Sequence, residues 1–143
     1  MSKSLALSIS LMAIATLVLA ACGGTGAAPA SNKPVDVQVT LTDFKIESSL
    51  TTFSTGVPYH FIVANKGAAP HEFRIMPPTA DPVSPEQVSQ MALAGISGQD
   101  LQPGATKTLD YTFTQPAPAG KLEFACHLPG HYDAGMHTPI VVQ

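Results

Sequence analysis

Alternating apolar and polar residues predict several short strands along the chain. Apolar side chains occupy every second position of residues 35–42, so one face of this segment is expected to be buried. Turn-forming residues separate it from the later strands, which is typical of an antiparallel β-sandwich or barrel. The other expected strands cover residues 59–64, 71–76, 106–114, 122–126 and 138–142.

One short helix is expected in an insertion after the third strand. Residues 77–83 are rich in proline, and Ser84-Pro85-Glu86-Gln87 follows them. Ser84 suits the N-cap, Pro85 the first helical position and Gln87 the third. We expect a helix near residues 84–94 that covers one edge of the sheets.

Residues 1–21 have the pattern of a signal peptide. Lys3 precedes an apolar run of residues 5–19, and small residues follow before Cys22. The alternative is a transmembrane helix that is retained. It is less favoured because the run is shorter than the roughly 20 residues that span a bilayer, and no basic stop-transfer residues follow it.

Leu19-Ala20-Ala21-Cys22 resembles the bacterial lipobox. That resemblance implies that Cys22 becomes the lipidated first residue of the mature chain, on the outer face of the cytoplasmic membrane or in the periplasm. Residues 22–34 would be the lipid anchor and a flexible linker, and residues 35–143 the folded domain. A disulfide between Cys22 and Cys126 is the alternative use of the two cysteines.

Composition narrows the possible partners. The 143 residues suit one ordinary domain after the signal peptide is removed, and only 12% are charged. The net charge is −3 and no basic cluster occurs, so nucleic acid is not an expected partner. We expect a monomer that meets its protein partners transiently.

Residues 124–136 contain the strongest candidate for chemistry. Cys126, His131 and Met136 follow one another at Cys-x4-His-x4-Met spacing, with Pro129-Gly130 bending the chain before the histidine. A thiolate, an imidazole and a weak thioether suit copper, and a trigonal His2Cys site with an axial Met needs one more histidine. His71, which begins the third strand, is the best candidate.

Other uses of these residues remain open. His127 lies next to Cys126, but strand alternation directs it to the opposite side, so we expect it at the surface. A zinc site formed by Cys126, His127, His131 and another residue would leave Met136 and His71 unexplained. Met136 alone could be core filler.

The domain resembles a cupredoxin, a blue copper protein of the plastocyanin/azurin type. The resemblance covers roughly residues 35–143 and is strongest in 65–76 and 121–142. It implies a Greek-key β-sandwich, with one copper ion held by His71, Cys126 and His131 and axially by Met136. It also places His131 near the surface as the electron port.

Glu72 departs from the family pattern, since many relatives have Asn or Ser directly after the first histidine. That Asn or Ser ties the two ligand loops together, and an ionised glutamate has no side-chain proton to donate. The backbone N–H of Glu72 could still reach the sulfur of Cys126.

The function expected is electron transfer by a type 1 copper that cycles between Cu(I) and Cu(II). The carrier would serve redox partner proteins at a membrane, to which its lipid anchor confines it. Leu128, Pro129 and Tyr132 could frame an apolar docking patch around His131. The alternative is copper binding for homeostasis or delivery. An enzyme is not expected, because no second metal set or acid–base pair is evident.

Overall fold

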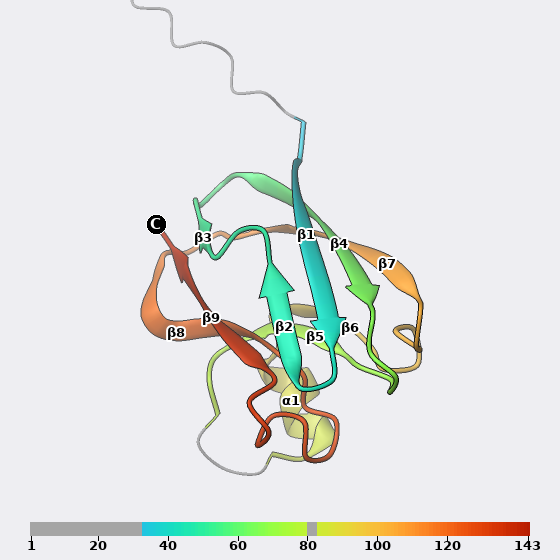
Figure 1. Ribbon diagram of the computed structural model, residues 1–143. Coiled ribbons are helices and arrows are strands. Elements are labelled where there is room, and N and C mark those ends of the chain that lie inside the picture. The colour runs from blue at the N-terminus through green and yellow to red at the C-terminus, as the bar shows by residue number, and fades with distance from the viewer. Residues whose placement is uncertain (1–32, 80–82) are drawn as a thin grey trace, which may run out of the picture. The chain divides into compact units, whose positions relative to one another are not determined.

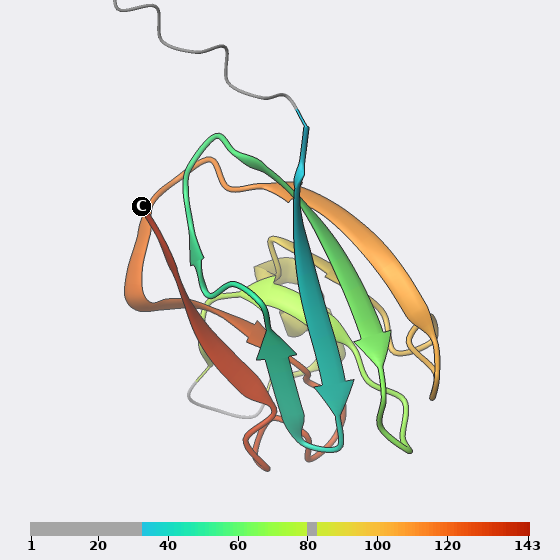
Figure 2. The ribbon, with the colours of Figure 1, turned by 45° about the horizontal axis from the view of Figure 1, so that its top comes forward.

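Two β-sheets face each other in the protein (Figures 1 and 2). The computed structural model describes residues 33–79 and 83–143. The expected signal peptide, Cys22 and most of the 22–34 linker lie outside the described residues. Within the described part, no helix is long and apolar enough to cross a membrane.

The first sheet has four strands in the order β2-β1-β4-β7. Every second residue of β4 is buried, as alternation in the sequence predicts. This sheet therefore turns one face toward the core. Its strands are β1 (Val35–Thr42), β2 (Lys45–Ser48), β4 (Pro58–Asn65) and β7 (Thr106–Thr112).

The second sheet has five strands in the order β3-β9-β8-β5-β6. Two neighbouring strands, β8 and β5, pair antiparallel, and β8 ends and β5 begins close to the predicted metal ligands. Its strands are β3 (Thr52–Phe53), β5 (Phe73–Met76), β6 (Ala94–Ile96), β8 (Ala117–Ala125) and β9 (His137–Val142).

The predicted β-sandwich with one short helix is confirmed, but the sheets are mixed and not purely antiparallel. β1 pairs with β4 in parallel, with Val35 opposite Tyr59, and β3 pairs with β9 in parallel. Alternation shows which face of a strand is buried. It does not show which strand lies beside it, or in which direction that neighbour runs.

A cluster of aromatic rings fills the space between the sheets. The ring of Phe53 lies 5.0 Å from that of Phe113 and 5.8 Å from that of Phe124. Burying each such side chain contributes roughly 1.5–3 kcal/mol. This packing holds in place the strands whose ends carry the metal ligands. The rings that are no more than 1% exposed belong to Phe53, Phe61, Phe73, Phe113 and Phe124.

The helix begins as predicted and ends earlier. α1 covers Pro85–Met91, and the Ser84 and Gln87 side chains form the expected capping box. Ala92 is extended, and the next residue donates its N–H to the carbonyl of Ile75. The chain therefore leaves the helix to form β6 at the sheet edge, where residues up to 94 were expected to be helical.

The helix packs on the outer face of the second sheet. Its one buried residue, Val88, joins a small cluster with Met76 and Ala125, separate from the core between the sheets. Ala125 points outward because its neighbours Phe124 and Cys126 point into the core. The insertion thus supplies the edge strand β6 and also covers the back of the strand that leads to Cys126.

β8 covers Ala117–Ala125 and so begins earlier than the strand predicted at residues 122–126. Ala117 already pairs with Val142, and the register then shifts before Leu122 pairs with Ile140. The residues between these two pairs therefore interrupt the ladder of hydrogen bonds but do not end the strand. The strand ends at Ala125, directly before Cys126.

Candidate metal centre

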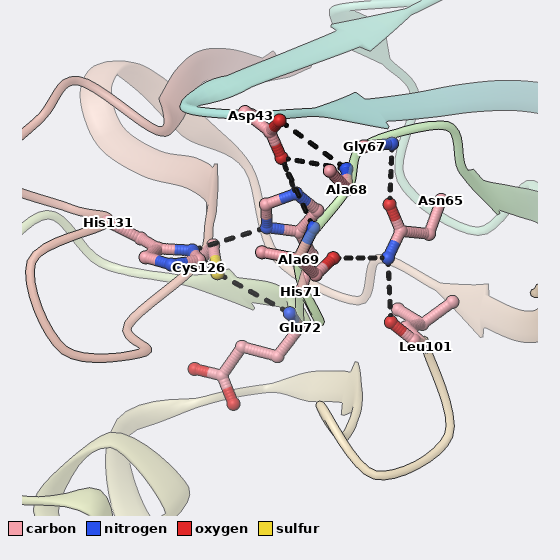
Figure 3. Close-up of polar contacts among 10 residues, drawn as sticks. All are labelled: Asp43, Asn65, Gly67, Ala68, Ala69, His71, Glu72, Leu101, Cys126 and His131. Carbon is pink, nitrogen blue, oxygen red and sulfur yellow. Dashed lines mark hydrogen bonds and ion pairs between the residues drawn. The ribbon is translucent and has the colours of Figure 1, made fainter. Parts of the chain in front are cut away.

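Three predicted ligands meet at one end of the sandwich (Figure 3). His71 lies between β4 and β5, Cys126 follows β8 directly, and His131 lies in the loop between β8 and β9. Their potential donor atoms all lie within 4.8 Å of one another, and no other group of three such residues was found in residues 33–79 and 83–143.

The donor atoms are spaced as a trigonal metal site requires. His71 Nδ1 lies 3.2 Å from His131 Nδ1, which lies 3.4 Å from Cys126 Sγ. Bonds of roughly 2.0–2.3 Å, as zinc makes to these donor types, would place trigonal ligand atoms about 3.5 Å apart. The three side chains therefore fit one ion with little rearrangement.

The site is closed on most sides. His71, Cys126 and Met136 are fully buried, whereas His131 is only half-buried. Met136 belongs to the same core cluster as Cys126, directly before β9. One imidazole edge of the candidate site is thus open to solvent.

The loop that carries Cys126, His131 and Met136 is closed by backbone hydrogen bonds. The N–H of Cys126 donates to the carbonyl of Met136 (3.0 Å), and the N–H of Met136 donates to the carbonyl of His131 (3.0 Å). Gly130 has φ of 79°, which glycine adopts without the strain that a side chain would cause. The expected Pro129-Gly130 bend is therefore present.

Asn65 organises the loop that leads to His71. It is 1% exposed, and its side-chain NH2 donates to the carbonyls of Ala69 (2.9 Å) and Leu101 (2.8 Å). Its side-chain oxygen accepts from the N–H of Gly67 (2.8 Å). A single amide thus replaces the missing sheet partners of this irregular segment.

The sulfur of Cys126 has the expected backbone partner. The N–H of Glu72 donates to it at 3.4 Å. Burial raises the pKa of the Cys126 thiol, and this hydrogen bond partly opposes that rise. Since a thiolate is the metal-binding form, metal binding must displace a proton here.

The side chain of Glu72 joins the two ligand segments as an acceptor. Its Oε1 accepts from the N–H of His127 at 3.0 Å. Its Oε2 accepts from Arg74 Nε at 3.2 Å and Nη2 at 3.0 Å. The departure from Asn or Ser therefore keeps a bridge between the segments, with the hydrogen bond running in the opposite direction.

The surroundings of His71 favour the neutral form of its imidazole. Burial lowers its pKa, as does the nearby His131, whereas Asp43 acts in the opposite direction. A neutral imidazole is the form that binds metals. The environment of His71 thus favours ligation.

His127 lies outside the ligand group, as the sequence predicts, but it is only partly exposed. Its ring stacks on Tyr132 with 4.3 Å between centroids and 15° between planes. The hydroxyl of Tyr132 donates to Glu123 Oε1 (2.7 Å), a residue only 2% exposed. Tyr132 is thus held by this stack and this hydrogen bond. The hollow that opens beside His131 is not lined by Leu128, Pro129 or Tyr132, the residues expected to frame it.

Two further residues at the site, Asp43 and Phe44, were not predicted from the sequence. Both lie in the turn between β1 and β2, and they line a hollow of about 300 Å³ together with Ala68, Ala69, His71 and His131. In the sequence, these two residues only mark a short break between two apolar stretches, which does not indicate a role at the site.

Solved structures of copper proteins share this fold. Auracyanin from Roseiflexus castenholzii matches with a TM-score of 0.57 and 19% identity, over 78% of this chain and 98% of that one. Rusticyanin matches with a TM-score of 0.54 and 20% identity, over 79% of each chain. The chain therefore has the cupredoxin fold. Its donor set, one thiolate and two imidazoles, suits a single copper ion.

Sequence relatives of the chain carry a more specific name. The copper-resistant cuproprotein CopI of Rubrivivax gelatinosus is 31% identical over 75% of this chain and 66% of that protein. The protein of the same name from Pseudomonas aeruginosa is 24% identical, over 81% of this chain and 80% of that one. No protein-family model matches the chain.

Proposed function

We propose that this cupredoxin carries single electrons through one copper ion held by His71, Cys126, His131 and Met136. The observation that carries the proposal is the spacing of the three nitrogen and sulfur atoms, 3.2 and 3.4 Å between neighbours. Side chains already placed for a trigonal ion need to move little when the copper changes oxidation state. Small movement favours rapid electron transfer.

The exposed edge of His131 is the proposed port for electrons. It is the half-buried member of the ligand group, and it opens on a hollow whose other walls include Phe44, Ala68 and Ala69. The largely apolar walls of this hollow suit a small, short-lived contact with a redox partner protein. With Met136 as fourth donor, the protein fills every coordination position, which favours a carrier over an enzyme with an open site.

The same proposal includes export and a lipid anchor at Cys22. Its support is the signal-like pattern of residues 1–21 and the Leu-Ala-Ala-Cys segment. An anchor would keep the monomeric carrier at high effective concentration near membrane-bound partners. Incorporation of labelled fatty acid in the wild type, and its loss in Cys22→Ala, would support this part. Equal labelling of both would contradict it.

A second candidate function is copper binding in homeostasis or delivery. The observation in its favour is the name copper-resistant cuproprotein shared by the two relatives. It requires that copper leave the site readily, whereas electron transfer requires that copper stay. The two functions therefore differ in the exchange rate of the metal.

The experiment is to load the full chain, in detergent, with one equivalent of copper. Cyclic voltammetry then tests for a reversible one-electron wave, and a competing chelator tests for release. A reversible wave with copper retained for hours supports the electron carrier. Rapid loss to the chelator without a reversible wave would contradict it and support delivery.

A further inference from the structure

The turn between β1 and β2 contacts both histidines of the copper site. Asp43 Oδ1 lies 3.3 Å from His71 Nε2. The ring of Phe44 meets the ring of His131 edge-on, with 5.5 Å between centroids and 79° between planes. Asp43 and Phe44, which are adjacent in the sequence and outside the ligand set, thus each contact one imidazole of the site.

The Asp43 contact involves the nitrogen of His71 that does not face the other ligands. Nδ1 points toward His131, so Nε2 carries the proton when Nδ1 binds copper (Figure 3). Nε2 is buried and has no conventional hydrogen-bond partner in the described part of the chain. At 3.3 Å, Asp43 Oδ1 is just beyond the usual range of about 2.7–3.2 Å, so a small rotation completes the bond.

The carboxylate of Asp43 is held in place by the loop that carries His71. Oδ1 accepts from the N–H of Ala68 at 3.1 Å and from that of Ala69 at 3.4 Å. A Cβ added at Gly67 would lie 2.6 Å from both Asp43 Oδ1 and His71 Nε2. The absence of a side chain at Gly67 therefore allows the carboxylate and the imidazole to meet.

The backbone of the turn is strained where it presents these groups. Phe44 has φ of 63°, a left-handed conformation that a bulky residue rarely adopts, and it is 52% exposed. Strain of this kind persists only where other contacts hold it. Here the holding contacts are those of Asp43 with the His71 loop and of Phe44 with His131.

We propose that Asp43 is a positioning residue for the copper site, which fixes the orientation of His71 and lowers the reduction potential. A carboxylate that accepts from the distal N–H of a ligating histidine fixes its tautomer and strengthens it as a donor. The negative charge also favours Cu(II) over Cu(I), because Cu(II) carries one more positive charge. The inference rests on the proposed copper site.

The test compares Asp43→Asn with the wild type, both as full chains. Asparagine keeps the size and an acceptor oxygen but removes the charge. We expect Cu(II) to bind about 10-fold more weakly, within the range for partners of metal-bound histidines, with Cu(I) affinity changed less. A tenfold selective loss of Cu(II) affinity corresponds to a rise in potential of about 59 mV.

Two further variants separate positioning from a general effect of surface charge. Asp36→Asn removes an exposed charge from β1 and should leave potential and affinity unchanged. Asp43→Glu keeps the charge, so its potential should stay nearer the wild type than that of Asp43→Asn. Nuclear magnetic resonance of the Cu(I) form should show a slowly exchanging proton on His71 Nε2 in the wild type, and faster exchange in Asp43→Ala.

The outcomes distinguish this inference from the proposed function. A wild type without a copper–thiolate band would contradict the copper site itself. A wild type with that band, together with an Asp43→Asn protein of unchanged potential and unchanged Cu(II) affinity, would overturn the role of Asp43 alone. If Asp43→Asn fails to fold, the Asp43→Glu potential and the His71 proton of the wild type decide the question.

Discussion

Glu72 offers the sharpest test of how the two ligand segments are held together. Its side chain is 9% exposed, and its carboxylate accepts from the N–H of His127 and from two nitrogens of Arg74. Glu72→Ala removes all three hydrogen bonds at once. It leaves a backbone N–H and a guanidinium, whose side chain is 19% exposed, without their partner.

The expected loss follows from these contacts. An unsatisfied buried N–H costs roughly 1–3 kcal/mol. Breaking a buried ion pair by removing one partner costs about 3–5 kcal/mol, and water that reaches Arg74 reduces this. We therefore expect Glu72→Ala to lower the free energy of unfolding by about 2–4 kcal/mol. Glu72→Gln keeps an acceptor for His127 and should lose about half as much.

Denaturant unfolding of the metal-free protein measures these differences without the contribution of copper binding. Glu47→Ala is the matched control, because Glu47 pairs with Lys45 at the surface, with side chains 56% and 64% exposed. Such exposed pairs contribute about 0–1 kcal/mol. If Glu72→Ala were no more destabilising than Glu47→Ala, the bridge would not hold the segments together.

Three other predictions follow from the site. Cys126→Ser should abolish the copper–thiolate band and His127→Ala should retain it, as visible spectra can show; loss of the band in His127→Ala would mean that the ligand set is wrong. Burial lowers the pKa of His127 below its ordinary 6.5, so the free energy of unfolding should fall as the pH drops below about 6.5. When unfolding is measured at pH 5, 6 and 7, this fall should be smaller in His127→Gln. An equal slope in both proteins would refute this. Phe44→Gly should relieve the strain of the turn and change the free energy of unfolding by no more than about 1 kcal/mol. Because the Phe44 ring also covers part of the His131 ring, solvent exchange at the ring nitrogen of His131 should become faster. Unchanged exchange would contradict this shielding of His131 by Phe44.

The sequence predicted the parts of the fold that depend on local pattern. Alternation located the strong strands, and Ser84 with Gln87 located the start of the helix. The spacing of Cys126, His131 and Met136 predicted one loop that bends at Pro129-Gly130, and the loop is present. These features are encoded within a few residues of one another.

The remaining features depend on residues that are distant in the sequence. Nothing local indicates that Val35 pairs in parallel with Tyr59, or that residues 94–96 leave the helix to join Phe73 and its neighbours as an edge strand. Asp43 gives no signal of its own, because its role appears only when the β1–β2 turn lies against the loop before His71.

Glu72 shows how chemical reasoning from sequence can be incomplete. A carboxylate cannot donate, and this property suggested a loss of the tie between ligand segments. The structure supplies a donor on the other side, the backbone N–H of His127, together with Arg74 two residues further along the chain. Partners of this kind are visible only once both segments are placed.

The central claim is that one copper ion is bound by Cys126, His71 and His131 together. X-ray absorption and electron-spin resonance spectra of the protein loaded with one equivalent of Cu(II) test it most directly. We predict one short copper–sulfur bond and two imidazole nitrogens per copper, with the sulfur absent in Cys126→Ser. Copper bound without sulfur in the wild type, or an unchanged copper environment in Cys126→Ser, would contradict the claim.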